Sequence, residues 1–149
     1  MDPSEKASTL FNTNFNCAQS VLASFAGELG LTEDELLRVA SAFGGGIGRQ
    51  QLTCGAVTGA AMALGLTFGK GKNDSDDKKQ QTYDKTVELF EEFTRLNGST
   101  SCRKLLHDLD MRDEKQYAEI EAQNLFHTHC RKYVADAVKI TEQIIGKSG

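Results

Sequence analysis

The segment 54–68 constrains the fold most, because nearly all of its residues are small or apolar and none is charged. It contains Gly55, Gly59 and Gly65. A glycine inside a helix costs up to about 1 kcal/mol relative to alanine. A helix that tolerates this cost gains close approach of neighbouring backbones. We therefore predict a helix over 54–68, capped by Thr53, at the centre of the molecule with its neighbours packed tightly on it.

The rest of the chain also has helical patterning. Its only proline is Pro3, and no segment alternates apolar and polar residues with the period of two that a strand requires. Capping residues and apolar spacing predict further helices over 17–29, from Thr32 to Phe43, over 75–97, from Cys102, over 112–126 and over 130–145. We expect an all-α fold without a sheet, a compact single-domain array of about six helices over residues 1–149.

Two of these helices have stripes that we expect to face the core. In the helix after Thr32, the inward residues are Leu36, Leu37, Val39, Ala40 and Phe43. In the helix over 75–97, the stripe consists of Tyr83, Val87, Phe90 and Thr94, and three further apolar residues lie beside it, Leu89, Phe93 and Leu96. This second stripe could serve a partner helix, but burial in the core accounts for it without a partner.

Composition and charge exclude several classes of partner. The net charge of −4 is mild, and the basic residues form no stripe, which argues against a nucleic acid or an anionic membrane surface as partner. The longest run of low charge, 52–69, is too short and too rich in glycine for a membrane span. The first six residues are polar, so we expect no secretory signal and a cytoplasmic protein. Cytoplasmic thiols are normally reduced, which favours metal binding or redox chemistry over structural disulfides. The sequence does not fix the oligomeric state.

The chain has four cysteines, Cys17, Cys54, Cys102 and Cys130, each expected in or just before the first turn of a helix. Free N–H groups and the helix dipole stabilise negative charge there, so we expect lowered thiol pKa values. No two form a Cys-x-x-Cys pair, which excludes a zinc knuckle and the thioredoxin motif. The alternative is that each cysteine is a small buried hydrophobe.

The motif Cys54-Gly55-Ala56-x-x-Gly59 follows Cys17 and precedes Cys102 and Cys130. In this order, and with the glycine-rich approach over 43–49, the chain resembles the C_GCAxxG_C_C family of redox-active proteins with four spaced cysteines. The resemblance covers nearly the whole chain. It implies redox activity and a helical fold, and it names no substrate.

Other residues near these cysteines are candidates for the same site. Gly55 and Gly59 lie on one helical face, where the absence of side chains would let a helix or a cofactor approach Cys54. One of the histidines, His107, His127 or His129, could replace a cysteine as a metal ligand, and the favoured alternative for each is an ordinary surface or core histidine. The glycine-rich segment lacks the pattern of a phosphate loop and is interpreted as a flexible turn.

Three functions remain open. In the first, the four cysteines hold an iron–sulfur cluster or zinc, and a cluster would make the protein an electron carrier. In the second, Cys54 is a reactive thiolate in thiol–disulfide exchange, and Cys17, Cys102 or Cys130 resolves it. Either redox function predicts a redox partner protein or a small thiol as partner. In the third, the chain is a non-catalytic interaction module with structural cysteines.

Overall fold

In the computed structural model, residues 1–147 are described, and helices dominate them. The elements are α1 (Pro3–Asn12), α2 (Cys17–Ala23), α3 (Glu33–Ala40), the 3-10 turn η1 (Ser41–Phe43), α4 (Gly55–Phe68), α5 (Asp76–Asn97), α6 (Cys102–Leu105), α7 (Glu114–Ala122), the π-helical turn η2 (Phe126–Cys130) and α8 (Arg131–Lys147). Over this range there is no strand, and one isolated bridge joins Thr53 and Ser101. The all-α prediction is confirmed, with eight α-helices in these residues where about six were expected.

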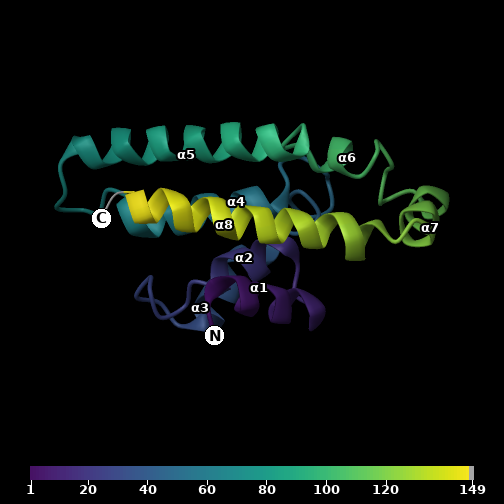
Figure 1. Cartoon of the computed structure of the whole chain (residues 1–149), viewed down its shortest axis with the longest axis horizontal. Coiled ribbons are helices and arrows are strands. Elements are labelled where there is room, and N and C mark those ends of the chain that lie inside the picture. Colours follow the sequence, from purple (N-terminus) through teal and green to yellow (C-terminus); the bar gives the residue numbers. More distant parts are fainter. Residues whose placement is uncertain (148–149) are drawn as a thin grey trace.

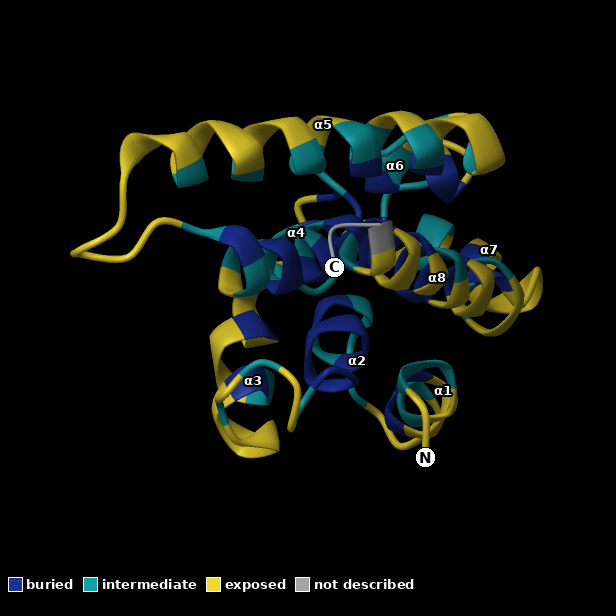
Figure 2. Ribbon diagram, turned by 60° about the vertical axis from the view of Figure 1, so that its left-hand side comes forward, coloured by how far each residue is buried: buried dark blue, intermediate teal, exposed yellow. Residues whose placement is uncertain are grey.

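Helix α4 is central, as the small residues of 54–68 predict. It packs against α5 and α8 on one side and α2 on the other, and it is largely buried in Figure 2. Figure 1 shows α5 and α8 as two long helices running in opposite directions, with α1 to α3 below them. A Cβ on Gly59 would lie 2.6 Å from the Ala18 carbonyl oxygen of α2, so only glycine permits this approach. Among residues 1–147, no helix is long and apolar enough to cross a membrane.

Side-chain caps explain where several helices begin. Reciprocal capping boxes start α1, α2 and α3, and the one predicted at Thr32 and Glu35 is present. Helix α1 was not predicted from sequence, although Pro3 occupies its first position and Asp2 caps it. The left-handed Gly98, with φ of +86°, ends α5.

Two predicted helices end early. The helix predicted over 17–29 stops at Ala23, where the buried Ser24 hydroxyl donates a hydrogen bond to the Val21 carbonyl at 2.6 Å. This local bond competes with continuation of the helix, and Gly27 then takes a φ of +92°. The helix predicted over 112–126 stops at Ala122, and Phe126 belongs instead to η2 at the start of the last helical run.

The stripe predicted to bury α5 faces the wrong way. Tyr83 is 56% exposed and Val87 is 54% exposed, whereas Leu89 and Phe93 are fully buried against the core. On Tyr83, the Lys79 ammonium lies 6.0 Å from the ring centroid, a contact that suits an exposed aromatic side chain. Thr94 of the stripe is also exposed, and Phe90 is half-buried. Likewise, the predicted inward residue Val39 of α3 is 56% exposed. Apolar spacing located both helices correctly but assigned their inward faces with errors. The neighbouring helices determine which face of each helix is buried.

Candidate functional site: a four-cysteine cavity

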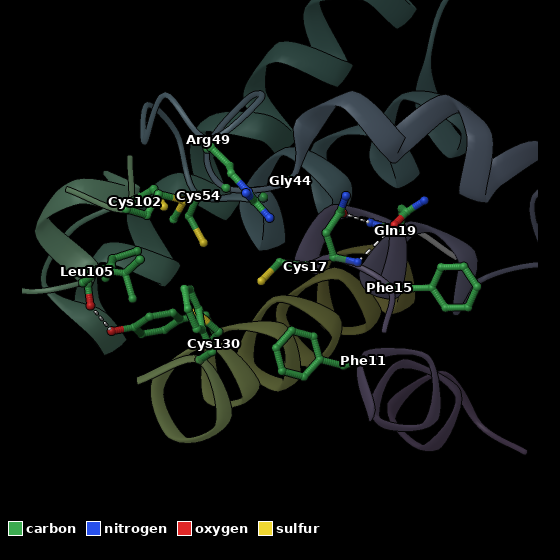
Figure 3. Close-up of a pocket in the computed structure, with 18 of the residues that line it drawn as sticks. Phe11, Phe15, Cys17, Gln19, Gly44, Arg49, Cys54, Cys102, Leu105 and Cys130 are labelled. Carbon is green, nitrogen blue, oxygen red and sulfur yellow. Dashed lines mark hydrogen bonds between the residues drawn. The ribbon is translucent and has the colours of Figure 1, made fainter. Parts of the chain in front are cut away.

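The four cysteines, distant along the chain, line one cavity of about 670 Å³. Figure 3 shows the labelled cysteines arranged around it, with the Cys17 and Cys54 sulfurs directed inward. All four are free thiols. Three are nearly buried, with 4% exposure at Cys54, 8% at Cys102 and 9% at Cys130, and Cys17 is half-buried. The structure therefore brings together the residues that the sequence singled out.

Helix starts position three of the four thiols. Cys17 is the first residue of α2, Cys54 is the cap of α4, and Cys102 is the first residue of α6. Cys130 differs, because it ends η2, which runs without a break into α8. The predicted position in or just before the first turn of a helix is confirmed for all four cysteines, but the start of α8 beside Cys130 is not a free one, because η2 continues into it.

Backbone pairing holds Cys54 beside Cys102. The Cys54 N–H donates to the Thr100 carbonyl at 2.8 Å, and the Cys102 N–H donates to the Leu52 carbonyl at 2.7 Å. These bonds flank the Thr53–Ser101 bridge. The start of α4 and the start of α6 are thus fixed to each other by main-chain bonds, so the two thiols share one wall of the cavity.

Burial is the largest influence on the pKa values of Cys54 and Cys102, the two thiols of this wall. The N–H groups of Ala56 and Val57 lower the pKa of Cys54, but desolvation outweighs them and raises it to about 12. Desolvation, aided by Cys54, raises the pKa of Cys102 to about 12 as well, and Arg103 offsets only part of this. The expectation that helix-start cysteines have lowered pKa values is therefore wrong here, because these sulfurs are removed from water.

Cys17 and Cys130 form the opposite wall and interact directly. A side-chain hydrogen bond joins the two thiols, and it lowers the pKa of Cys130 while it raises that of Cys17 well above its ordinary value. The physical reason is that the Cys17 thiol donates to the Cys130 thiolate, so the pair holds one proton more readily than two or none. Of the four thiols, only Cys130 has a lowered pKa.

A left-handed turn borders the cavity. Five consecutive residues have positive φ: Gly45 (63°), Gly46 (67°), Ile47 (70°), Gly48 (56°) and Arg49 (65°). For a non-glycine residue this conformation costs about 1–2 kcal/mol, so Ile47 and Arg49 store strain. Glycines at the other three positions avoid it. The flexible turn predicted here is in fact a specific backbone shape, and it directs the Arg49 side chain into the cavity (Figure 3).

Gln51 anchors the segment that follows this turn, a role that sequence reasoning missed. Its side chain is almost fully buried, at 3% exposure. Its Nε2 donates to the Leu109 carbonyl at 2.8 Å, and its Oε1 accepts from the Met111 N–H at 2.8 Å. A glutamine in a loop gives no sequence signal of this kind, because its partners lie about sixty residues away.

Tyr133 closes another part of the cavity lining. Its hydroxyl donates to the Leu105 carbonyl at 2.9 Å, the bond drawn in Figure 3, and so ties α8 to α6. Desolvation, reinforced by the neighbouring cysteines, raises its pKa to about 12. Tyr133 therefore stays protonated as a hydrogen-bond donor at neutral pH.

The two glycines of the motif have different positions. Gly55 lines the cavity beside Cys54, whereas Gly59 contacts α2 at Ala18 and does not line it. Among the histidines, His127 lines the cavity, and His107 and His129 form an edge-to-face pair with ring centroids 5.1 Å apart.

The donor set can be compared with what a metal requires. Within residues 1–147, no group of three or more histidine, cysteine or acidic side chains is placed to hold a metal ion. By ligand chemistry alone, four cysteine thiolates are the usual donors of both structural zinc and iron–sulfur clusters.

Comparisons with known proteins agree with the cysteine pattern. An uncharacterized protein of Archaeoglobus fulgidus is 28% identical over 152 residues, which cover 95% of this chain and 94% of that protein. No solved structure matches the chain significantly. The family described as "Putative redox-active protein (C_GCAxxG_C_C)" matches residues 15–144, which include all four cysteines and the Cys54–Gly59 motif. The chain therefore belongs to the C_GCAxxG_C_C redox-active protein family.

Proposed function

We propose that this protein is a dithiol–disulfide redox protein in which Cys17 and Cys130 are the reacting pair. The observation that carries the proposal is that Cys17 and Cys130 line one cavity, where the interaction between their side chains lowers the pKa of Cys130. The thiolate is the nucleophile in thiol–disulfide exchange, so the cysteine with the lowered pKa reacts first. Cys54 is the less suitable nucleophile, because burial raises its pKa to about 12.

The reaction consumes a disulfide and forms one. The Cys130 thiolate attacks one sulfur of a substrate disulfide, whose other sulfur leaves as a thiolate. Cys17 then gives up its proton and attacks the Cys130 sulfur, which forms the Cys17–Cys130 disulfide and releases the second substrate thiolate. The two protons of the protein thiols end on the two released thiols. In total, the substrate disulfide gains two electrons and the cysteine pair loses two.

An iron–sulfur cluster held by all four cysteines is a second candidate. The observation that favours it is the convergence of four thiols on one cavity, since two would suffice for a disulfide. A bound cluster would supply one-electron transfer. Anaerobic purification separates the candidates, because stoichiometric iron and sulfide with visible absorption supports the cluster. A colourless, metal-free protein whose thiols cycle supports the dithiol.

Disulfide mapping tests the proposed pair. Reduced protein is treated with hydroxyethyl disulfide, quenched by alkylation, digested and analysed by mass spectrometry. We expect a Cys17–Cys130 linked peptide and free Cys54 and Cys102. Cys17→Ser should stop the reaction at a mixed disulfide on Cys130, because the resolving thiol is absent. Cys54→Ser is the matched control and should still form the bond. A bond that always includes Cys54, or none at all, would contradict the proposal.

A further inference from the structure

The charge of the cavity lining points to the class of substrate. The chain carries 21 acidic residues and a net charge of −4, yet no aspartate or glutamate is among the described residues that line the cavity. Among the described residues of that lining, Arg49 is the only lysine or arginine. The guanidinium, with no carboxylate among the described lining residues, favours an anionic group at its side of the cavity.

The Arg49 guanidinium has no partner of its own. In the part of the chain that the structure describes, it makes no hydrogen bond or ion pair, and Figure 3 shows it directed between Cys54 and Cys17. Arg103 provides the contrast, since it pairs with Asp110 at 3.5 Å and is the cation that lowers the pKa of Cys102.

The size and the apolar part of the lining indicate a small molecule. A volume of about 670 Å³ lies in the usual range for small-molecule pockets. Aromatic rings form part of the wall, from Phe11, Tyr117 and Phe126. The strained left-handed turn fixes where Arg49 leaves the backbone, so the cation is held at one side of this wall.

We propose that the cavity selects small disulfides that carry an anionic group, such as a carboxylate, and that Arg49 binds this group. The inference rests on the proposed function, in which the Cys17–Cys130 pair reduces a disulfide. A guanidinium binds a carboxylate through paired N–H donors, which would hold the substrate's sulfur end toward the thiols. Exchange with an anionic disulfide then proceeds as above, with two electrons and two protons passing to two substrate thiols.

Three disulfides of different charge test this selectivity: dithiodiglycolate (anionic), hydroxyethyl disulfide (neutral) and cystamine (cationic). The oxidation rate of reduced protein is measured with each one by mass spectrometry. We expect Arg49→Gln to slow oxidation of the protein by dithiodiglycolate about fivefold and to leave the rate of oxidation by the neutral disulfide unchanged. Arg49→Lys should retain most of the preference, because it keeps the charge. Arg38→Gln, which changes an exposed arginine outside the cavity lining, is the control and should behave like the wild type.

Two results of this rate comparison would overturn the inference. Equal slowing of all three disulfides by Arg49→Gln would mean that Arg49 acts on the Cys130 thiolate, and no slowing would mean that Arg49 does not contact the ligand.

A binding experiment tests the inference separately from the proposed function, which fails if no disulfide oxidises the cysteine pair. The thioether dianion thiodiglycolate cannot exchange, so its affinity for the Cys17→Ser, Cys130→Ser protein is measured by NMR titration. We expect Arg49→Gln to weaken that affinity about fivefold, and an unchanged affinity would refute anion selection.

Discussion

The two walls of the cysteine cavity present the same residue type and differ in chemistry. Cys54 and Cys102 begin helices, are fixed together by main-chain bonds, and both have their pKa raised to about 12 by burial. Cys17 and Cys130 instead share a thiol hydrogen bond, which lowers the pKa of Cys130. One wall is thus kept as neutral thiols, and the other holds the group that ionises most easily.

The difference shows that a specific partner outweighs position on a helix. The N–H groups of α4 are directed at Cys54, yet its thiol remains neutral. Loss of solvation destabilises the thiolate more than these two N–H groups stabilise it. Cys130 lies inside a helical run and gains its acidity from one neighbouring thiol. Sequence position therefore identifies candidate cysteines, and tertiary contacts decide which of them reacts.

Selective alkylation gives the largest expected difference between the thiols of the two walls. At about pH 8, we expect iodoacetamide to label Cys130 first, because its pKa is lowered, whereas the rise of the Cys54 pKa to about 12 cuts the Cys54 thiolate fraction on the order of a thousandfold below that of an ordinary thiol. Cys54 and Cys130 have similar exposure, 4% and 9%, so access alone does not predict this order. Peptide mass mapping over time measures the four rates. Cys17→Ala should slow labelling of Cys130, whereas Cys17→Ser keeps a donor and should slow it less. Faster labelling of Cys54 would reverse the assignment of the walls.

The neutral wall should make the protein sensitive to alkali. The pKa values of Cys54 and Cys102 are raised to about 12 in the fold, so the unfolded chain releases these protons at lower pH than the folded chain does. Their contribution to stability is complete below about pH 9 and is lost as the pH rises toward 12. For the two thiols together, we expect a loss of about 3 kcal/mol per pH unit above pH 9.

Urea unfolding of the reduced protein, repeated across this pH range, measures that loss. Cys54→Ala is the matched variant, and its stability should fall less steeply, by about 1.4 kcal/mol per pH unit, because one of the two raised pKa values is gone. An unchanged slope in this variant would show that Cys54 ionises normally in the fold. The two walls would then be alike in acidity.

Much of the fold follows from local sequence signals. The cap at Thr32, the start of α5 after Ser75 and its end at Gly98 follow from short-range chemistry, and the small residues of 54–68 predict the central helix. The face that α5 turns to the core was mispredicted, because both of its sides carry apolar residues and neighbouring helices decide between them. Tyr83 is exposed for that reason.

The site was predictable in its cysteines and not in the residues around them. The motif at Cys54, with three further cysteines, indicated a shared site. Gln51 and Arg49 gave no local signal, because a buried hydrogen-bonded glutamine and a left-handed arginine depend on contacts formed only in the folded chain. The glycines have two different structural roles. Gly59 provides space for α2, whereas Gly48 provides a positive φ.

Gly59→Ala tests how the two walls are held at their present separation. The new Cβ would lie 2.6 Å from the Ala18 carbonyl oxygen, so α2, which carries Cys17, must move from α4, which begins after Cys54. Overpacking of this kind costs about 2 kcal/mol, measured as the free energy of unfolding in urea. Gly65→Ala is the control within α4, because no atom lies within 4 Å of its Cβ. It should gain about 0.5–1 kcal/mol from helix propensity. Equal effects in both variants would mean that the α2–α4 contact yields easily.

Gly48→Ala tests the smallest contribution, the left-handed turn beside the Cys54 wall. No atom lies within 4 Å of a Cβ at Gly48, so its φ of +56° alone sets the cost, about 1 kcal/mol in the free energy of unfolding. Gly30→Ala is the matched control, with a φ of +79°, equal space and a position away from the cavity, and it should cost the same. If the turn only carries Arg49, Gly48→Ala should leave the alkylation rates of both walls unchanged. A changed rate at Cys54 or Cys102 would mean that the turn also sets the acidity of that wall.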